Sequence, residues 1–387
     1  FGDTTKGDYA YESAPNSTDL TWETVITKNI GLDLGFLNNR LNVSFDAYIR
    51  DTKDMLMAGK TLPGVYGASS PRMNVADLRT KGWEASITWG DSFTLASKPF
   101  NYRVMAGIGD NTSKVTKYDN PNRTLTDPYE GQQLGEIWGY IVDGYFKTDE
   151  EARNYKVDQS FVNQMINASA LDNGLHAGDL KFVDLDGNNK IEQTTSANDR
   201  KDMKVIGNSL PRYNYNFGIS ADWYGIDFSV LFQGIGKQNW YPGAETSMFW
   251  GPYSRPYASF IPSDFMSQVW SEENTDAYFP RPRGYVVLGS NRELAVVNTK
   301  YLQNLAYCRL KNLSIGYTLP DKWLSKIGFE KIRVYFSGEN LLTFTKLHSD
   351  YIDPEQASAS NSWKTSKSDA NIYPWAKTYS FGVDITF

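Results

Sequence analysis

The stretch RYNYNFGISADWYGIDFSVLFQG, residues 212–234, shows a two-residue period on both sides of a short link. Apolar side chains occupy every second position from Tyr213 to Trp223, and again from Ile226 to Phe232. Only Tyr-Gly at 224–225 separates the two runs. This alternation is typical of an antiparallel β-hairpin with one apolar and one polar face.

The same period recurs along the chain, at 30–36, 41–49, 83–89, 102–108, 313–319, 332–336 and 379–387. Together with the hairpin these runs predict about nine strands, several of them long enough for the ~9–11 residues that a tilted membrane strand needs. Short links lie at 36–41, 90–100, 224–225 and 320–330, and long links at 51–75, 110–209, 238–303 and 347–376. Such a rhythm predicts a transmembrane antiparallel β-barrel, with short periplasmic turns, long extracellular loops and a periplasmic C-terminus.

Composition agrees with a barrel. Mean hydropathy is −0.50, yet 14% of the residues are aromatic, as expected where only alternate residues face lipid. The net charge of −6 argues against a nucleic-acid partner. A single cysteine, Cys308, excludes a disulfide framework within the chain, and the sequence contains no catalytic motif.

The odd number of strands bears on whether this sheet can close into a barrel by itself. Bacterial single-chain barrels use an even number, and an unclosed sheet in lipid leaves unpaired backbone groups at its edges. We therefore expect residues 1–387 to form the C-terminal part of a larger barrel, beginning in an extracellular loop.

Seven segments, in this order, resemble SusC/RagA-type TonB-linked outer-membrane transporters of Bacteroidetes. They are LGEIWGYIVDGYF (134–146), GDLKFVDLDGNNKI (178–191), DRKDMKVIGNSLPRYNYNFG (199–218), GIDFSVLFQG (225–234), CRLKNLSIGYTLP (308–320), KIRVYFSGENLLTFTK (331–346) and TYSFGVDITF (378–387).

The resemblance implies a 22-stranded barrel with an N-terminal plug, and import of glycan oligomers or peptides. It further implies two partners, a SusD-like surface lipoprotein that acts as a lid and the TonB complex, which would act through parts absent from this sequence. The plug and the early strands are also absent. The alternative is a soluble carbohydrate-binding or hydrolytic β-sheet protein.

The segment DLDGNNKIE, residues 184–192, resembles a calcium loop. Oxygen-bearing side chains recur at alternate positions, as in an EF-hand, but position 12 is Thr195 rather than a bidentate carboxylate. We expect a structural Ca²⁺, and Asp199 is the candidate to replace the missing carboxylate. The alternative is a polar turn bonded to itself. The predicted ligands are Asp184, Asp186, Asn188, Lys190 through its carbonyl, Glu192 and Asp199.

Two further segments are candidates for contacts. The loop at 240–260 contains Trp240, Tyr241, Phe249, Trp250, Tyr253 and Tyr257, which are candidates to contact substrate or lid protein, or alternatively pack the loop itself. In the terminal strand, Tyr379, Phe381 and Phe387 alternate with polar residues. The family resemblance implies that this strand faces lipid, closes the barrel and is read by the assembly machinery. A short helix is also expected after Thr148 as N-cap.

Overall fold

The computed structural model describes residues 20–59, 65, 67, 70–163, 174–255, 260–289, 291–324, 328–357, 367–368 and 373–387. The predicted extracellular start of the chain, residues 1–19, lies outside the described residues. None of the described helices is long and apolar enough to cross a membrane.

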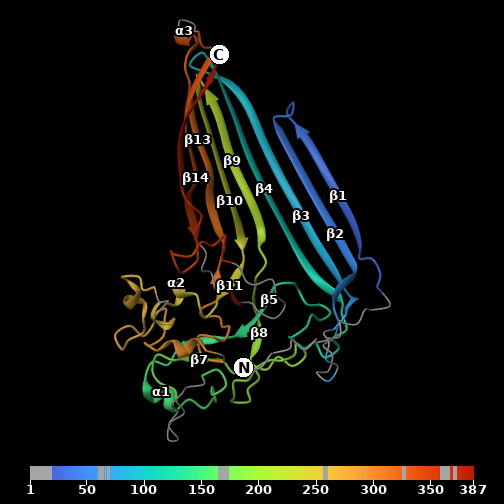
Figure 1. The fold of residues 1–387 in the computed structure, drawn as a ribbon, viewed down its shortest axis with the longest axis vertical. Helices are drawn as coiled ribbons and strands as arrows, with labels where there is room; N and C mark the ends of the chain where they lie inside the picture. Colours follow the sequence, from blue (N-terminus) through green and yellow to red (C-terminus); the bar gives the residue numbers. More distant parts are fainter. Residues whose placement is uncertain are drawn as a thin grey trace, which may run out of the picture.

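A nine-stranded antiparallel sheet dominates the molecule, with neighbours in the order β1-β2-β3-β4-β9-β10-β13-β14-β16 (Figure 1). Every predicted run falls on one of these strands, so the strand prediction is confirmed. The bounds are β1 Thr24–Phe36, β2 Leu41–Ala58, β3 Arg72–Leu95, β4 Lys98–Lys117, β9 Arg212–Trp223, β10 Ile226–Lys237, β13 Tyr307–Thr318, β14 Lys331–Thr345 and β16 Thr378–Thr386.

Two of the short turns are tight because both of their central residues have positive φ. Tyr224 and Gly225 have φ of 50° and 84°, and Ala96 and Ser97 have φ of 47° and 62°. Positive φ at both central residues gives the twist that a two-residue hairpin needs. The expected link at 90–100 is therefore too long, because Leu95 already pairs with Lys98.

Each strand presents an apolar face and a polar face, and register aligns these faces across the sheet. One row on the apolar face consists of Leu34, Val43, Ile87, Ala106, Phe217, Phe232, Leu310 and Leu342. The adjacent row on the polar face consists of Asp33, Ser44, Ser86, Gly107, Asn216, Gln233, Arg309 and Thr343. An apolar band continuous across strands is the surface that a lipid bilayer requires.

The apolar band stops partway along β2, β3 and β4. Beyond Ile49 the same face carries the paired Asp51 and Arg79, whose Nε–Oδ1 distance is 2.6 Å. Asp110 on β4 likewise forms an ion pair with Arg212. Charged pairs on this face mark the limit of the part suited to hydrocarbon, because an ion in lipid is costly.

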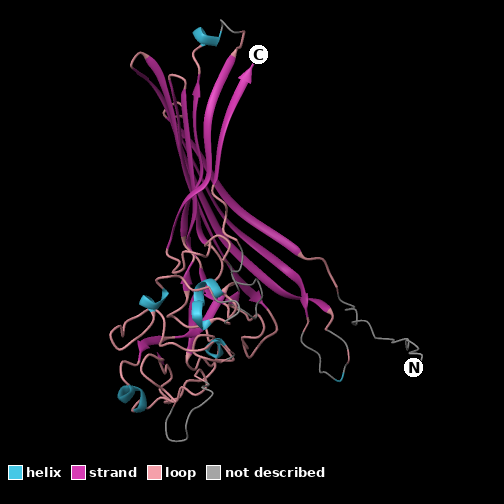
Figure 2. Ribbon diagram, turned by 60° about the vertical axis from the view of Figure 1, so that its left-hand side comes forward, coloured by secondary structure: helices cyan, strands magenta, loops and turns pink. Residues whose placement is uncertain are grey.

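The last three long links fold together at the end of the sheet opposite the C-terminus (Figures 1 and 2). We call their described residues, 118–163, 174–211, 238–255, 260–289, 291–306 and 346–357, the loop domain. It contains small sheets and short helices, whereas α3 Asp321–Leu324 lies in a short turn. The elements of the loop domain are β5 Glu136–Tyr140, β6 Val142–Tyr145, α1 Asp149–Arg153, β7 Leu180–Phe182, β8 Met203–Asn208, β11 Asn239–Pro242, α2 Ser247–Trp250, η2 Gly251–Tyr253, η3 Phe265–Gln268, η4 Tyr285–Leu288 and β12 Gln303–Asn304, with β15 Lys367–Ser368 pairing onto β11.

Helix α1 begins as predicted. The Thr148 side chain accepts a hydrogen bond from the Glu151 N–H, and Glu151 accepts one from the Lys147 N–H. The first bond satisfies one open N–H donor of the helix start, and the second holds the residue before the N-cap.

Candidate functional site

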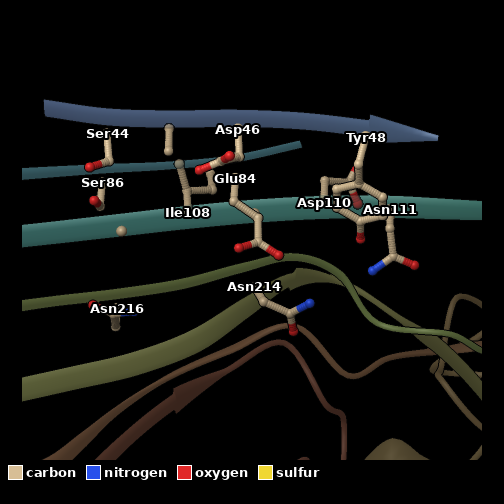
Figure 3. A pocket seen from close by; sticks show the side chains of 13 residues that line it. Ser44, Asp46, Tyr48, Glu84, Ser86, Ile108, Asp110, Asn111, Asn214 and Asn216 are labelled. Atoms are coloured by element: carbon tan, nitrogen blue, oxygen red, sulfur yellow. The ribbon is translucent and has the colours of Figure 1, made fainter. Parts of the chain in front are cut away.

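The polar face of β2, β3, β4 and β9 encloses a hollow of about 360 Å³ (Figure 3). Most of its polar lining alternates along each strand, which places these side chains on one side of the sheet, and Asp110, next to Asn111, also borders the hollow. They are Ser44, Asp46, Tyr48, Glu84, Ser86, Asn111, Asn214 and Asn216, with Gly107 and Gly109 between them. In a closed barrel this face is the inner wall, so the hollow belongs to the passage side of the sheet.

Two carboxylates oppose each other in this hollow. Asp46 on β2 is the register partner of Glu84 on β3, and Gly31 and Gly109 continue the same row on either side. Sequence reasoning missed this pair because opposition depends on register. The tight turn that pairs Phe36 with Leu41 fixes the register of β1 against β2 only, and the long link between β2 and β3 offers no local signal for theirs.

Where the sheet meets the loop domain, Arg309 links the loop domain to the polar face. It lies on β13, and its guanidinium contacts Asp353 and Glu355, each with an N–O distance of 2.6 Å. Arg309 and Asp353 are both buried. The last long link is thereby held over the passage side of the sheet.

A second buried ionic cluster joins two long links. The Asp179 carboxylate, completely buried, pairs with Arg281 and Arg283, and Arg283 also contacts Glu293. Breaking a buried pair by removing one partner costs ~3–5 kcal/mol, so this cluster fixes the link after β4 against the link after β10.

The aromatic residues of the 240–260 loop lie in the interior of the loop domain. Trp240, Tyr241, Phe249, Trp250 and Tyr253 are at most 2% exposed. Their polar atoms are satisfied internally, for example the Trp250 Nε1–H by the Gly243 carbonyl. In this structure the five side chains are packed inside the loop domain, which fits the alternative of internal packing. Tyr257 lies outside the described residues.

The 184–192 segment forms a tight turn with its side-chain oxygens turned inward. Asp184 accepts hydrogen bonds from the N–H groups of Gly187 and Asn189, and Asp186 accepts one from Asn188. In turn the Asn188 side chain bonds to the Lys190 N–H and to Glu192. These contacts also fit the polar-turn alternative.

The carboxylate that joins this turn is Asp202, not Asp199. One oxygen each of Asp184, Asp186 and Asp202 lie within 4.8 Å of one another. Buried Asp202 accepts hydrogen bonds from the N–H groups of Leu185 and Glu192. Asp199 is not part of this cluster, and its N–H bonds to the Ser196 carbonyl in a neighbouring turn.

The electrostatics of the turn are consistent with crowded negative charge. Burial, with the charges of Asp186 and Asp184, raises the pKa of Asp202. Burial also acts to raise the pKa of Asp184, but hydrogen bonds from Asn189 and Gly187 outweigh it and hold that pKa below its usual value.

The terminal strand β16 pairs only with β14 among the described strands. Tyr379, Phe381 and Phe387 project from its apolar face and are 62%, 83% and 82% exposed. The exposed apolar face of β16 is suited to lipid, and its open edge is suited to pairing with a further strand.

An antiparallel sheet with one lipid-compatible face, one polar face and long links folded over one end defines part of the wall of a transmembrane β-barrel. Residues 2–341 match the family model described as TonB dependent receptor-like, beta-barrel. The chain belongs to this family.

Relatives include TonB-dependent receptor P3 of Formosa agariphila, 28% identical over 95% of this chain, and TonB-dependent receptor SusC of Bacteroides thetaiotaomicron, 25% identical over 100% of it. The chain spans only 34% of the length of either. Among solved structures, the RagAB peptide importer in its open-open state matches with a TM-score of 0.68 and 22% identity, over 97% of this chain and 36% of that one. This likeness confirms the barrel fold.

Proposed function

We propose that the protein containing this chain is an active importer of the bacterial outer membrane, driven by TonB. The family match over residues 2–341 carries the proposal, and the apolar band over a polar inner wall supports it. The TonB complex would act through parts of the protein outside this chain. Family membership argues against the alternative of a soluble binding or hydrolytic protein.

The orientation follows from the same arrangement. The short turns and the C-terminus would be periplasmic, and the loop domain extracellular. A SusD-like lipoprotein would cover the loop domain as a lid. Support comes from relatives named SusC and RagAB and from the ionic clusters around Arg309 and Asp179, which make the loop domain a firm platform.

The cargo would be a glycan oligomer or a peptide. The decisive test is uptake of labelled oligosaccharides and labelled oligopeptides by cells that carry the full-length gene, with and without TonB. One cargo class should accumulate only when TonB is present. Accumulation that is equal in both strains would contradict active import.

Lid binding is tested separately. An affinity tag on the full-length protein should co-purify a surface lipoprotein in mild detergent. Purification of the transporter without any lipoprotein, from cells that express the whole locus, would contradict lid binding. It would not contradict import driven by TonB.

A further inference from the structure

Basic side chains collect on the apolar face of β1 to β4, just beyond the apolar band and away from the short turns. Two neighbouring register rows cross the face there. The row next to the band is Lys28, Ile49, Lys81 and Thr112, and the row beyond it is Ile26, Asp51, Arg79 and Lys114. We call Lys28, Arg79, Lys81 and Lys114 the basic rim. In these two rows a single carboxylate stands among four cations.

The three lysines of the basic rim are left without a partner. Arg79 donates two hydrogen bonds to Asp51, of 2.6 and 3.1 Å, and so neutralises the one acid of these rows. Among the described residues, no hydrogen bond or ion pair holds the ammonium groups of the three lysines, which are all exposed. Asp110, in the adjacent row of the band, is buried and pairs with Arg212. The rim therefore presents positive charge that these strands do not balance.

The basic rim lies at the level of the lipid headgroups. Trp83 is in the row of the band next to Lys81, and Trp89 lies toward the other end of β3, where its Nε1–H bonds to the Tyr102 hydroxyl. Tryptophan and tyrosine mark the two interfaces of a membrane barrel. The eight residues from Lys81 to Trp89 cover ~26 Å along the strand, or ~20 Å of height at the usual tilt. An extended lysine then reaches the upper boundary of an apolar band that is ~25 Å tall.

At the opposite end of the same strands the charges have partners. Arg40, in the turn between β1 and β2, pairs with Asp91 of β3 at an N–O distance of 3.2 Å. The Lys98 ammonium lies 5.2 Å from the ring centroid of Tyr224. The two leaflets of the membrane therefore meet different surfaces, and unbalanced positive charge faces only the leaflet on the side of the loop domain.

We propose that the basic rim binds the phosphate-bearing headgroup of a lipid in the outer leaflet. In a closed barrel the apolar face meets lipid, so a lipid headgroup is the anion that can approach these lysines while its acyl chains cover the band. Lys28 and Lys81 flank Ile49 at ~10 Å across two strand spacings, and Lys114 is the diagonal neighbour of Lys81. Ammonium groups bind phosphate as point charges, so this spacing can engage more than one anionic group of a single headgroup.

The inference rests on the proposed extracellular position of the loop domain, which assigns the basic rim to the outer leaflet. It does not depend on the cargo or on the lid, because the rim is on the opposite face of the sheet from the passage.

Native mass spectrometry of the full-length transporter in mild detergent tests the proposal. The probes are lipid A with its phosphate groups and the same lipid after dephosphorylation. The unaltered transporter should bind the dephosphorylated lipid at least about tenfold more weakly, because the lysines then have no anionic partner. A loss of similar size for the phosphorylated lipid is expected in the triple variant Lys28→Gln, Lys81→Gln and Lys114→Gln.

The matched control removes the same charge from three exposed lysines of the loop domain, through Lys147→Gln, Lys156→Gln and Lys204→Gln. It should bind the phosphorylated lipid as tightly as the unaltered transporter. Equal affinity for the two lipids, an unchanged affinity in the rim variant or an equal loss in the control would overturn the proposal. So would displacement of the lipid by an equimolar amount of inorganic phosphate.

Two features keep this test independent of other outcomes. The comparison of the two lipids uses the unaltered protein, so it holds even where the rim variant does not assemble. Lipid binding is read without energised import, so a failed uptake assay does not affect it, and labelling of the loop domain on intact cells tests the orientation separately.

Discussion

Tyr48 and Gly82 show how single residues set the inner wall. They are register partners on β2 and β3, and a Cβ added to Gly82 would lie 2.4 Å from Cζ of Tyr48. The phenol ring therefore covers the glycine backbone. Tyr335 and Gly382 repeat the arrangement on β14 and β16, with a corresponding distance of 2.3 Å.

Gly82→Ala should lower the free energy of unfolding of the full-length barrel by ~1–3 kcal/mol, because the ring of Tyr48 must leave its position. Urea denaturation in lipid vesicles measures the effect. Gly90→Ala is the control on the same strand, since its Cβ would meet only a carbonyl oxygen at 3.7 Å. Equal stability of the two variants would count against close packing at Gly82.

The residues that sequence reasoning missed or misplaced have long-range partners. Asp179 is 102 residues from Arg281, and Arg309 is 44 residues from Asp353. Local periodicity carries no information about such contacts. Composition likewise could not show that the aromatic residues of 240–260 point into the loop domain, because interfaces and interiors are both rich in tryptophan and tyrosine.

At the scale of elements, the strands were predictable because their alternation is local and repeated in every strand. The turn at 184–192 was also predictable from the spacing of its oxygens. Its closing carboxylate was not, because the path of the chain beyond the turn depends on tertiary contacts such as the hydrogen bond from the Thr194 hydroxyl to the Arg200 carbonyl.

We propose that the turn binds Ca²⁺ through Asp184, Asp186 and Asp202, with further oxygens from the turn or water. Asp184→Asn with Asp186→Asn should weaken calcium binding at least about tenfold, because Ca²⁺ prefers ionised carboxylates. Calorimetry on the full-length transporter measures the affinity, and calcium should slow amide exchange in residues 184–202 only in the unaltered protein.

Asp199→Asn supplies the comparison, because Asp199 lies outside the carboxylate cluster. It should leave calcium affinity unchanged. A structure determined in millimolar calcium with no ion between the three carboxylates would refute the site.

Strand β16 gives a second prediction at this scale. Phe387→Asp should reduce the amount of assembled transporter several-fold, while uptake per assembled molecule stays the same. A charge near the membrane interface costs only ~0–1 kcal/mol, so the loss would arise from recognition during assembly. Immunoblots of outer-membrane fractions give the amount. Thr386→Asp, on the opposite face of the same strand, should assemble normally, and equal amounts of both variants would argue against the assembly role.

At the scale of the whole molecule, the sheet with one apolar and one polar face determines how the protein fractionates and how it migrates on a gel. The full-length protein should fractionate with the outer membrane and migrate faster on a denaturing gel before boiling than after it. The reason is that every strand of a closed barrel is hydrogen-bonded on both sides, so detergent leaves the barrel folded until it is boiled. Recovery of the protein as a soluble monomer without detergent would be incompatible with this fold.

The length of β3 and β4 has a consequence for the cell surface. The strands contain 24 and 20 residues, whereas ~11 residues suffice to cross a bilayer. About 13 residues of β3 and about nine of β4 are left over, and at ~3.3 Å per residue they extend the hairpin by roughly 30–40 Å beyond the hydrocarbon. The outward face of β3 there carries Arg79, which pairs with Asp51 of β2, rather than an apolar side chain. With the loop domain extracellular, as proposed above, an antibody raised against residues 72–80 should label intact cells, whereas one against residues 91–102 should label them only after the envelope is opened.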